Sequence, residues 1–281
     1  MSSDAVTTTC PRSPADTDWV ETEVQGLRWR LCMQRYIDRE IATTKVFEPA
    51  TTELVRRIVR PGMRVLDVGA NLGYFTLLFA RQVGPTGRVW AFEPVERYRE
   101  QLRWHVAANG FEDRVQICDY GLSDASITMN VALDWCGGTL HWTRAEAPDT
   151  REPARFLPLD VVASELGLNH VDFVKLDVDG HEPFFFRGAS AFFRHNRPLM
   201  VVEFSQANLD VAGEDVRTLK EAIEELGYTL YSERTGKSYA NRHDFLFDAG
   251  NFTHSANVWA VPDTLATPGI PLDQITASSR A

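Results

Sequence analysis

The chain has 281 residues, of which 44% are hydrophobic, and a formal net charge of −10. This length allows one large domain with a complete hydrophobic core. The acidic balance disfavours nucleic acid as the main partner, because contacts to phosphates supply most of that binding energy. No apolar run approaches the roughly 20 residues that a membrane-spanning helix needs, so we expect no membrane partner either.

The N-terminal residues 1–18 are rich in serine, threonine, proline and aspartate, which predicts a disordered leader. They lack the basic and apolar regions of a signal peptide. No two of the four cysteines form a C-x-x-C pair. We therefore expect free thiols, no zinc site and a reducing, cytoplasmic location.

Short apolar runs alternate with helical patterns along most of the chain. Residues 19–60 are expected to form an N-terminal cap, with a strand or short hairpin over 23–33 and a helix over 50–59. Within residues 61–265 the expected strands are 64–69, 87–94, 113–124, 171–180, 198–205, 228–234 and 255–262. The expected helices are 74–84, 96–110, 159–167, 181–196 and 213–227, and a C-terminal tail follows over 266–281.

Residues 126–144 break this alternation with two β-like runs around Gly137 and Gly138, which predicts a β-hairpin insertion. The hairpin carries Trp135 and Trp142, so we expect it to form part of an acceptor pocket or a dimer contact. Residues 147–155 are expected to be a loop. The strand–helix alternation itself predicts an α/β fold with a doubly wound, mostly parallel sheet, whose ligands bind at the carboxyl ends of the strands.

The turn after the strand over 64–69 carries Asp67, Gly69, Asn71 and Gly73. The two glycines allow a sharp turn and a close approach of the backbone to a ligand, although the asparagine is also a common turn former. A dinucleotide-binding motif would place a glycine at position 67, where a carboxylate repels a pyrophosphate by about 4 kcal/mol at about 4 Å. This turn therefore disfavours a dehydrogenase and predicts a phosphate-free, cationic nucleoside as the ligand.

Glu93 lies at the end of the next strand, where an acid binds ribose hydroxyls in dinucleotide-binding folds. Charge-assisted hydrogen bonds of this kind contribute roughly 1.5–3 kcal/mol each. A nucleoside with a positive charge and no phosphate describes S-adenosylmethionine. Its sulfonium and amino groups suit Asp67 and its ribose suits Glu93, so the sequence predicts S-adenosylmethionine as the cofactor.

Five stretches, VLDVGANLGYFTLLFA, GRVWAFEP, GLSD, LDVV and VKLDVDGHE, together resemble the FkbM-type methyltransferases, a branch of the class I S-adenosylmethionine-dependent enzymes. The resemblance covers about residues 45–205. It implies a Rossmann-like, seven-stranded sheet with an antiparallel last strand. It also implies O-methylation of a hydroxyl on a small molecule, either a natural product or a sugar. One departure is Asp179, where the family usually has glutamate.

The expected cofactor site combines these motifs with the residues that follow each strand. The segment Phe47-Glu48 is expected to close over the cofactor, or else to be an N-terminal packing contact. Asp119 and Ser123 fall where folds of this kind contact adenine. The expected cofactor-binding residues are Glu48, Asp67, Gly69, Asn71, Gly73, Tyr74, Phe75, Glu93, Pro94, Asp119, Gly121, Ser123 and Asp177.

A hydroxyl group is a very weak acid, so its methylation needs a base or a metal ion to help remove the proton. The expected catalytic residues are His181, Asp177 and Glu203, near the ends of two neighbouring strands. In the favoured mechanism Asp177 orients His181, which takes the proton with an ordinary pKa near 6.5. In the other, Asp177 and Glu203 hold Mg²⁺ through oxygen ligands.

Structural roles remain open for the same residues. His181 could be a surface residue at the start of a helix, and Glu203 could be a structural acid paired with an arginine. Lys175 lies within an apolar strand and is expected to pair with an acid, because a lone buried charge is costly.

Two other functions compete with O-methylation. A non-catalytic module that binds S-adenosylmethionine would keep Asp67 and Glu93 without needing the catalytic residues. An N-methyltransferase acting on a macromolecule would place Pro-Pro and an aromatic residue after the fourth strand, which the stretch DVDGHE lacks. We therefore expect a small hydroxylated acceptor as the partner, with the N-terminal segment and the hairpin as candidate contacts of a homo-oligomer.

Overall fold

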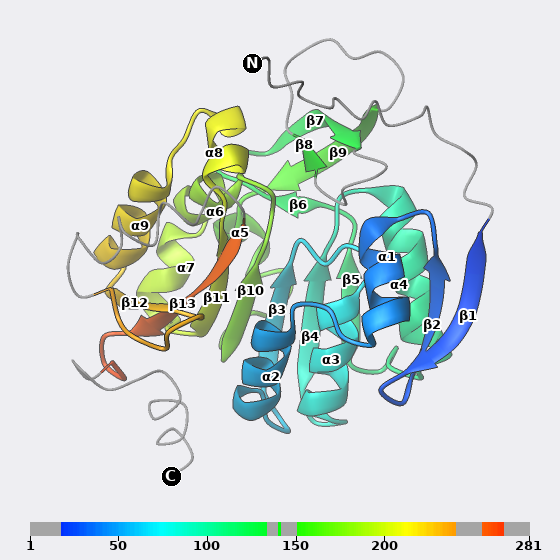
Figure 1. The fold of residues 1–281 in the computed structure, drawn as a ribbon. Coiled ribbons are helices and arrows are strands. Elements are labelled where there is room, and N and C mark those ends of the chain that lie inside the picture. Colours follow the sequence, from blue (N-terminus) through cyan, green and yellow to red (C-terminus); the bar gives the residue numbers. More distant parts are fainter. Residues whose placement is uncertain (1–17, 134–139, 142–150, 240–254, 267–281) are drawn as a thin grey trace, which may run out of the picture.

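The structure is a computed structural model that describes residues 18–133, 140–141, 151–239 and 255–266. Its central sheet contains β3 Arg64–Val68, β4 Arg88–Phe92, β5 Val115–Cys118, β10 Phe173–Leu176, β11 Leu199–Phe204, β12 Tyr228–Ser232 and β13 Ala256–Pro262. The strand order is β12-β13-β11-β10-β3-β4-β5 (Figure 1). β13 runs antiparallel to both of its neighbours, β11 and β12, and the other strands of the sheet run parallel to one another. The expected seven-stranded sheet with an antiparallel last strand is confirmed.

The order of strands in the sheet reverses between β3 and β10. From β3 the chain continues to β4 and β5 on one side, whereas β10 and β11 lie on the other side. Ligands of open α/β sheets bind outside the carboxyl ends of the strands at such a reversal. The topology therefore places the loops after β3, β4 and β10 around a ligand.

Helices cover both faces of the sheet and enclose two hydrophobic cores. Alternate residues of a strand face opposite sides, so Val65 packs in one core and Leu66 in the other. The core around Val65 is covered by α1 Tyr36–Thr44, α2 Pro49–Ile58, α3 Tyr74–Val83 and α4 Glu96–Ala108. The other is covered by α5 Leu159–Val162, α6 Glu182–Arg187, α7 Ser190–His195, α8 Gln206–Ala212 and α9 Val216–Glu225. Among the described residues, no helix has the length and apolar character to cross a membrane.

The N-terminal cap contains the expected hairpin, formed by β1 Trp19–Val24 and β2 Leu27–Cys32 and followed by α1 and α2. The helix expected over 181–196 is instead the two short helices α6 and α7, which are separated at Gly188. A Cβ at Gly188 would lie 1.9 Å from the carbonyl oxygen of Ser123, so only glycine permits this close backbone approach.

A second, four-stranded sheet lies at the carboxyl end of the central sheet (Figure 1). Two of its strands, β7 Ile127–Leu133 and β8 Leu140–His141, form the expected hairpin. The expectation of a loop over 147–155 is wrong. Most of that range belongs to β9 Arg151–Leu157, which pairs with β7 and with β6 Gly121–Leu122.

The sequence of β9 conceals its strand character. Ala154 and Phe156 alternate into a small core, but Pro153 and the arginines around it interrupt the apolar pattern. Trp135 and Trp142 lie outside the described residues, as do nearly all of the expected leader and tail. The expected role of the hairpin in an acceptor pocket or a dimer therefore stays a prediction.

Candidate active site

A cavity at the carboxyl ends of β3, β4 and β10 is the candidate active site. It encloses about 1090 Å³, including the space open to solvent. The reversal of strand order indicates this position for a ligand. The sequence-predicted residues that line the cavity are Glu48, Asp67, Gly69, Asn71, Tyr74, Phe75, Glu93, Pro94, Gly121, Asp177, His181 and Glu203.

The turn between β3 and α3 passes very close to the end of β10. Gly69 has a φ of +85°, and a Cβ at this position would lie 1.7 Å from the carbonyl oxygen of Asp177. Only glycine can occupy this position. Asn71 has a φ of +49°, and its side-chain oxygen accepts the N–H of Leu72 at 2.7 Å. Its side chain therefore stabilises the turn, while its backbone N–H donates a hydrogen bond to Glu93 after β4.

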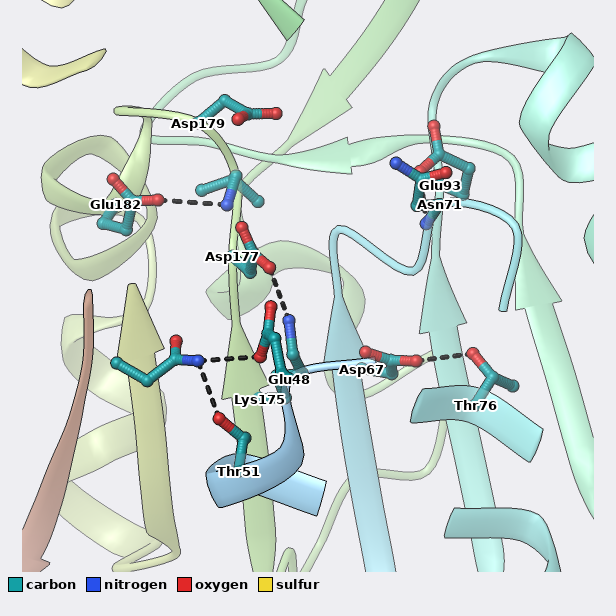
Figure 2. A network of polar contacts seen from close by, with 12 residues as sticks. Glu48, Thr51, Asp67, Asn71, Thr76, Glu93, Lys175, Asp177, Asp179 and Glu182 are labelled. Carbon is teal, nitrogen blue, oxygen red and sulfur yellow. Dashed lines mark hydrogen bonds and ion pairs between the residues drawn. The ribbon is translucent and has the colours of Figure 1, made fainter. Parts of the chain in front are cut away.

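Glu93 lies directly after β4 with only 1% of its surface exposed. Its Oε2 accepts the backbone N–H of Asn71 and its Oε1 that of Val95, both at 2.8 Å. Figure 2 shows the carboxylate beside Asn71. Burial raises the pKa of Glu93 to about 7, although these two hydrogen bonds act to lower it. Each carboxylate oxygen has a further lone-pair site, so Glu93 can still accept hydrogen bonds from a diol in the cavity.

Asp67 on β3 is a second buried acid of the same cavity. Its Oδ2 accepts a hydrogen bond from the hydroxyl of Thr76 on α3 (Figure 2). Burial raises its pKa to about 6, and the ammonium of Lys175 acts in the opposite direction. A positive charge on a bound ligand would therefore stabilise the ionised form of Asp67.

Lys175 on β10 forms the ion pair that the sequence predicts. Its Nζ donates to Asp177 Oδ2 at 2.6 Å and lies 4.7 Å from the ring centre of Phe75, and the residue is only 3% exposed. Burial acts to lower the pKa of Lys175, but Asp177, Glu48 and Asp67 raise it above its ordinary value. Lys175 is therefore a permanently charged group that positions carboxylates, not a base.

Glu48 reaches into the cavity from the start of α2. Its Oε2 accepts Asn257 Nδ2 at 2.7 Å, and the same nitrogen donates to Thr51 Oγ1 at 2.8 Å. Figure 2 shows its carboxylate beside Lys175 and Asp177. Burial raises the pKa of Glu48 to about 7, while Lys175 acts to lower it. The side chain of Glu48 thus faces the cavity, as the expectation of a closing segment requires.

Three acids form a cluster at the end of β10 and β11. Asp177, Asp179 and Glu203 each offer a carboxylate oxygen, and these oxygens lie within 4.8 Å of one another. The Oε2 atom of Glu203 is buried and accepts no hydrogen bond from any residue that the structure describes. Burial and the neighbouring acids raise the pKa of Glu203 well above its ordinary value, although a side-chain hydrogen bond with Ser255 acts to lower it. The alternative in which Glu203 pairs with an arginine does not occur within the described residues.

His181 occupies a different environment from the one expected. It is 5% exposed, its ring stacks on Phe184 at 4.5 Å, and its Nε2 lies 2.9 Å from Ser123 Oγ. The prediction that Asp177 orients His181 gains no support, because Asp177 Oδ2 accepts a hydrogen bond from Lys175 and His181 Nε2 lies beside Ser123. The alternative that His181 is a surface residue is wrong, because its side chain is buried. Burial lowers the pKa of His181 to about 4, which makes its imidazole a weak base at neutral pH.

The family of the protein follows from the sequence around these acids. The Methyltransferase FkbM domain matches residues 67–230, more than half of the chain. The chain belongs to the FkbM methyltransferase family. The matched range begins at Asp67 and includes Glu93, Asp177 and Glu203. S-adenosylmethionine is the cofactor of this class of methyltransferases, as the sequence predicts.

Several named proteins are similar to this FkbM methyltransferase. AMB antimetabolite synthetase AmbE of Pseudomonas aeruginosa is 28% identical over 217 residues, 62% of this chain and 10% of that protein. Protein-L-isoaspartate O-methyltransferase of Aeropyrum pernix is 40% identical over 58 residues, 21% of this chain and 22% of that enzyme. The chain thus spans a small part of the length of these two relatives. The structure of Aeropyrum pernix fibrillarin with S-adenosyl-L-methionine is 14% identical, covering 86% of this chain and 82% of that chain, with a TM-score of 0.44.

Three predicted cofactor residues of this FkbM methyltransferase are absent from the described lining of the cavity. Gly73 has a φ of +97° and forms the entry to α3, where a Cβ would meet a leucine side chain. Ser123 is fully buried against His181. The side chain of Asp119 is 65% exposed and pairs with Arg155 at 3.4 Å. The predicted adenine contacts of Asp119 and Ser123 therefore gain no support from their positions.

Sequence reasoning missed two residues of the site, Asp179 and Asn257. Asp179 completes the acid cluster, and its position two residues after Asp177 was a usable signal for a shared loop. Asn257 on β13 holds Glu48, and it lies 209 residues away along the chain. No local pattern marks such a pair.

Proposed function

We propose that this FkbM methyltransferase methylates a hydroxyl group of a small molecule, either a natural product or a sugar. The observation that carries the proposal is the acid cluster, where Glu203 Oε2 lacks a hydrogen-bond donor among the described residues. A buried carboxylate oxygen without a partner is costly, so it is ready to take a proton or a cation. The name of the related antimetabolite synthetase is in keeping with natural product biosynthesis.

The residues of the cavity suit an adenosine derivative that carries a positive charge. Glu93 accepts hydrogen bonds from the two ribose hydroxyls, Gly69 permits close approach of the backbone, and Asp67 favours a cation nearby. When bound, S-adenosylmethionine supplies an electrophilic methyl group on a positively charged sulfur. The protein contributes mainly by holding the acceptor oxygen in line with that methyl group.

Proton removal is the second contribution of the chain. Transfer of the methyl group to the acceptor oxygen would break the carbon–sulfur bond of the cofactor and leave S-adenosylhomocysteine, and Glu203 would take the proton of the acceptor hydroxyl as its O–H bond breaks. The raised pKa of Glu203 brings its basicity closer to that of a neutral-pH base than an ordinary carboxylate. Lys175 holds the carboxylate of Asp177 in one orientation near Glu203. This part of the cavity therefore keeps a fixed shape against the acceptor.

A divalent cation is the alternative means of activating the hydroxyl. Asp177, Asp179 and Glu203 supply three oxygen ligands of the kind that Mg²⁺ prefers, and these residues would hold it. A bound cation would lower the pKa of the acceptor hydroxyl as a Lewis acid. The unpartnered oxygen of Glu203 fits either a proton or a cation.

Metal removal separates the two means of activation. We expect methyl transfer to stay within about twofold after treatment with EDTA and gel filtration, because Glu203 can accept the proton itself. The measurement is the rate of product formation before and after treatment, with added MgCl₂ as the control. A loss of more than tenfold that MgCl₂ restores would replace the carboxylate base by a metal-assisted mechanism.

Glu93→Ala tests the position of the ribose. We expect the affinity for S-adenosylhomocysteine to fall by about 10- to 100-fold, which corresponds to roughly 1.5–3 kcal/mol for lost charge-assisted hydrogen bonds. Isothermal titration calorimetry measures the change. Glu53→Ala is the control, because Glu53 is an exposed acid on α2 that pairs with the exposed Arg57 and does not line the cavity. Unchanged affinity in Glu93→Ala would show that the ribose binds elsewhere.

A panel of acceptors tests the reaction type. The panel contains glycosides, macrolactone alcohols, DNA and a protein mixture, each incubated with methyl-labelled S-adenosylmethionine and analysed by mass spectrometry. We expect label on a small-molecule hydroxyl. Label on DNA or protein nitrogen alone would favour the N-methyltransferase, and binding of the cofactor with no labelled product from any acceptor would favour a non-catalytic module.

A further inference from the structure

A second cavity adjoins the candidate active site. It encloses about 1090 Å³, including the space open to solvent, and lies between the start of α2, the end of β12 and the start of β13. Its described lining shares Glu48, Glu203 and Ser255 with the first cavity. The two cavities are therefore contiguous at the acids that flank the expected reaction centre.

The order of the strands in the sheet indicates where the second cavity lies relative to Glu93. Glu93 follows β4, Asp177 follows β10, Glu203 lies on β11, and the second cavity lies at β13 and β12. We take the sulfur of a cofactor whose ribose binds Glu93 to lie toward Asp177 and Glu203, because the same cavity continues from Glu93 to these two acids. The second cavity lies beyond these acids, on the side away from the ribose.

We propose that the second cavity is the acceptor site and that it takes a hydroxyl-rich molecule without negative charge. The inference rests on the proposed function, because it assigns the direction of S-adenosylmethionine from Glu93. The acceptor hydroxyl enters between Glu48 and Glu203, the two acids that line both cavities.

A network of hydrogen bonds gives this cavity a fixed polar wall. Thr51 Oγ1 donates to Glu233 Oε1 at 2.7 Å, and Asn257 Nδ2 donates to Thr51 and to Glu48. Trp259 Nε1 donates to Glu233 Oε1 at 3.1 Å. In Figure 2 the dashed lines from Thr51 and Glu48 meet at one amide nitrogen, which is Asn257 Nδ2. The wall presents carboxylate oxygens in fixed positions, which accept hydrogen bonds from hydroxyl groups.

The charges around the cavity select against an anion. Glu48, Glu203 and Glu233 line it and are partly buried, whereas the basic residue of its described lining, Arg234, is exposed. A carboxylate or phosphate on the acceptor would lose its hydration beside three acids, with no buried cation in the described lining to pair with it, and each acid that ionises would repel it. A neutral polyol meets hydrogen-bond acceptors instead.

The backbone of Glu48 adds an independent observation. Its φ of +43° lies in the left-handed region, which residues other than glycine rarely adopt. Strained conformations of this kind persist at ligand sites, where the surrounding structure enforces them. Here the conformation directs the side chain to the boundary between the two cavities.

The experiment uses the full chain loaded with S-adenosylhomocysteine. Methyl α-D-glucopyranoside is the neutral probe and the methyl glycoside of glucuronic acid is its anionic counterpart, with binding measured by saturation-transfer-difference NMR titration. Ala50→Trp places a large side chain at the second cavity, from an exposed position in the first turn of α2. Arg57→Trp is the matched control, because its side chain is 52% exposed on the same helix away from the cavity.

We expect at least tenfold weaker binding of the neutral probe to Ala50→Trp, and a change of less than twofold in Arg57→Trp. The anionic probe should bind at least tenfold more weakly than the neutral one to the unaltered chain. Glu233→Gln, which keeps the shape of the wall, should reduce this discrimination. All three variants should retain their affinity for S-adenosylhomocysteine.

Three results would overturn the inference: no binding of the neutral probe to the loaded chain, equal binding of both probes, or neutral-probe affinity unaffected by Ala50→Trp. Each of these leaves the proposed function standing, provided that S-adenosylhomocysteine still binds. Failure of the unaltered chain to bind S-adenosylhomocysteine would instead overturn the proposed function itself.

Discussion

Replacing Glu203 by glutamine is expected to lower kcat by about 10²- to 10⁴-fold, the usual contribution of a positioned acid or base. The amide keeps the shape of the side chain but cannot take the proton of the acceptor hydroxyl. Affinity for S-adenosylhomocysteine should stay within about twofold, because Glu203 lies at the acceptor side of the cavity. Steady-state kinetics and calorimetry measure the two quantities separately.

The pH dependence of kcat gives the same prediction a second readout. Glu203 acts as a base only when ionised, and burial raises its pKa above the ordinary carboxyl range. The kcat of the unaltered enzyme should therefore rise with pH through this raised pKa and then level off. Glu203→Gln should lose this rising limb.

The control and the opposing outcome are specific. Glu53→Gln, an exposed acid in an ion pair with Arg57, should retain normal kcat and the same pH profile. If Glu203→Gln keeps the rising limb while His181→Gln loses it, the base is the imidazole of His181. That outcome would restore the mechanism favoured from the sequence.

Replacing Lys175 by methionine is expected to destabilise the protein by about 3–5 kcal/mol, the cost of removing one partner from a buried ion pair. The ammonium of Lys175 compensates Asp177, Glu48 and Asp67, which act on it together. Without it, these acids remain close to one another in a buried site. Urea unfolding followed by circular dichroism measures the loss of stability.

Two further variants check the origin of this effect. Arg57→Met removes an exposed i,i+4 pair with Glu53 on α2 and should change stability by about 1 kcal/mol or less. The double variant Lys175→Met with Asp177→Asn should recover part of the lost stability, because it removes an uncompensated charge. Stability of Lys175→Met within 1 kcal/mol of the unaltered chain would mean that the carboxylates are protonated or solvated without it.

Local patterns were enough to predict most of the fold. Mostly apolar stretches of four to six residues marked β3, β4, β10 and β11, and amphipathic spacing marked α2, α4 and α9. The pattern failed at β9, where Pro153 and charged residues interrupt the alternation of Ala154 and Phe156. It also failed at Gly188, because the close backbone contact that breaks the helix involves a residue from another segment.

The candidate site was predictable where it depended on strand ends. Asp67, Glu93 and Asp177 lie at the carboxyl end of parallel neighbouring strands, so a shared edge brings them together. Asp119 also lies close to a strand end, yet its side chain points to solvent and pairs with Arg155. Position along the chain does not determine which way a side chain outside a strand points.

Local sequence patterns specify most strands and helices of the central sheet, the glycine turn and the acids at the strand ends, because each depends on residues close together in the chain. The environment of each acid follows instead from the tertiary structure. It paired Asp177 with Lys175, buried His181 against Phe184, and joined Glu48 to Asn257 across 209 residues. Burial and charge pairing depend on contacts between distant segments, and these contacts set the pKa values and the shape of the cavity.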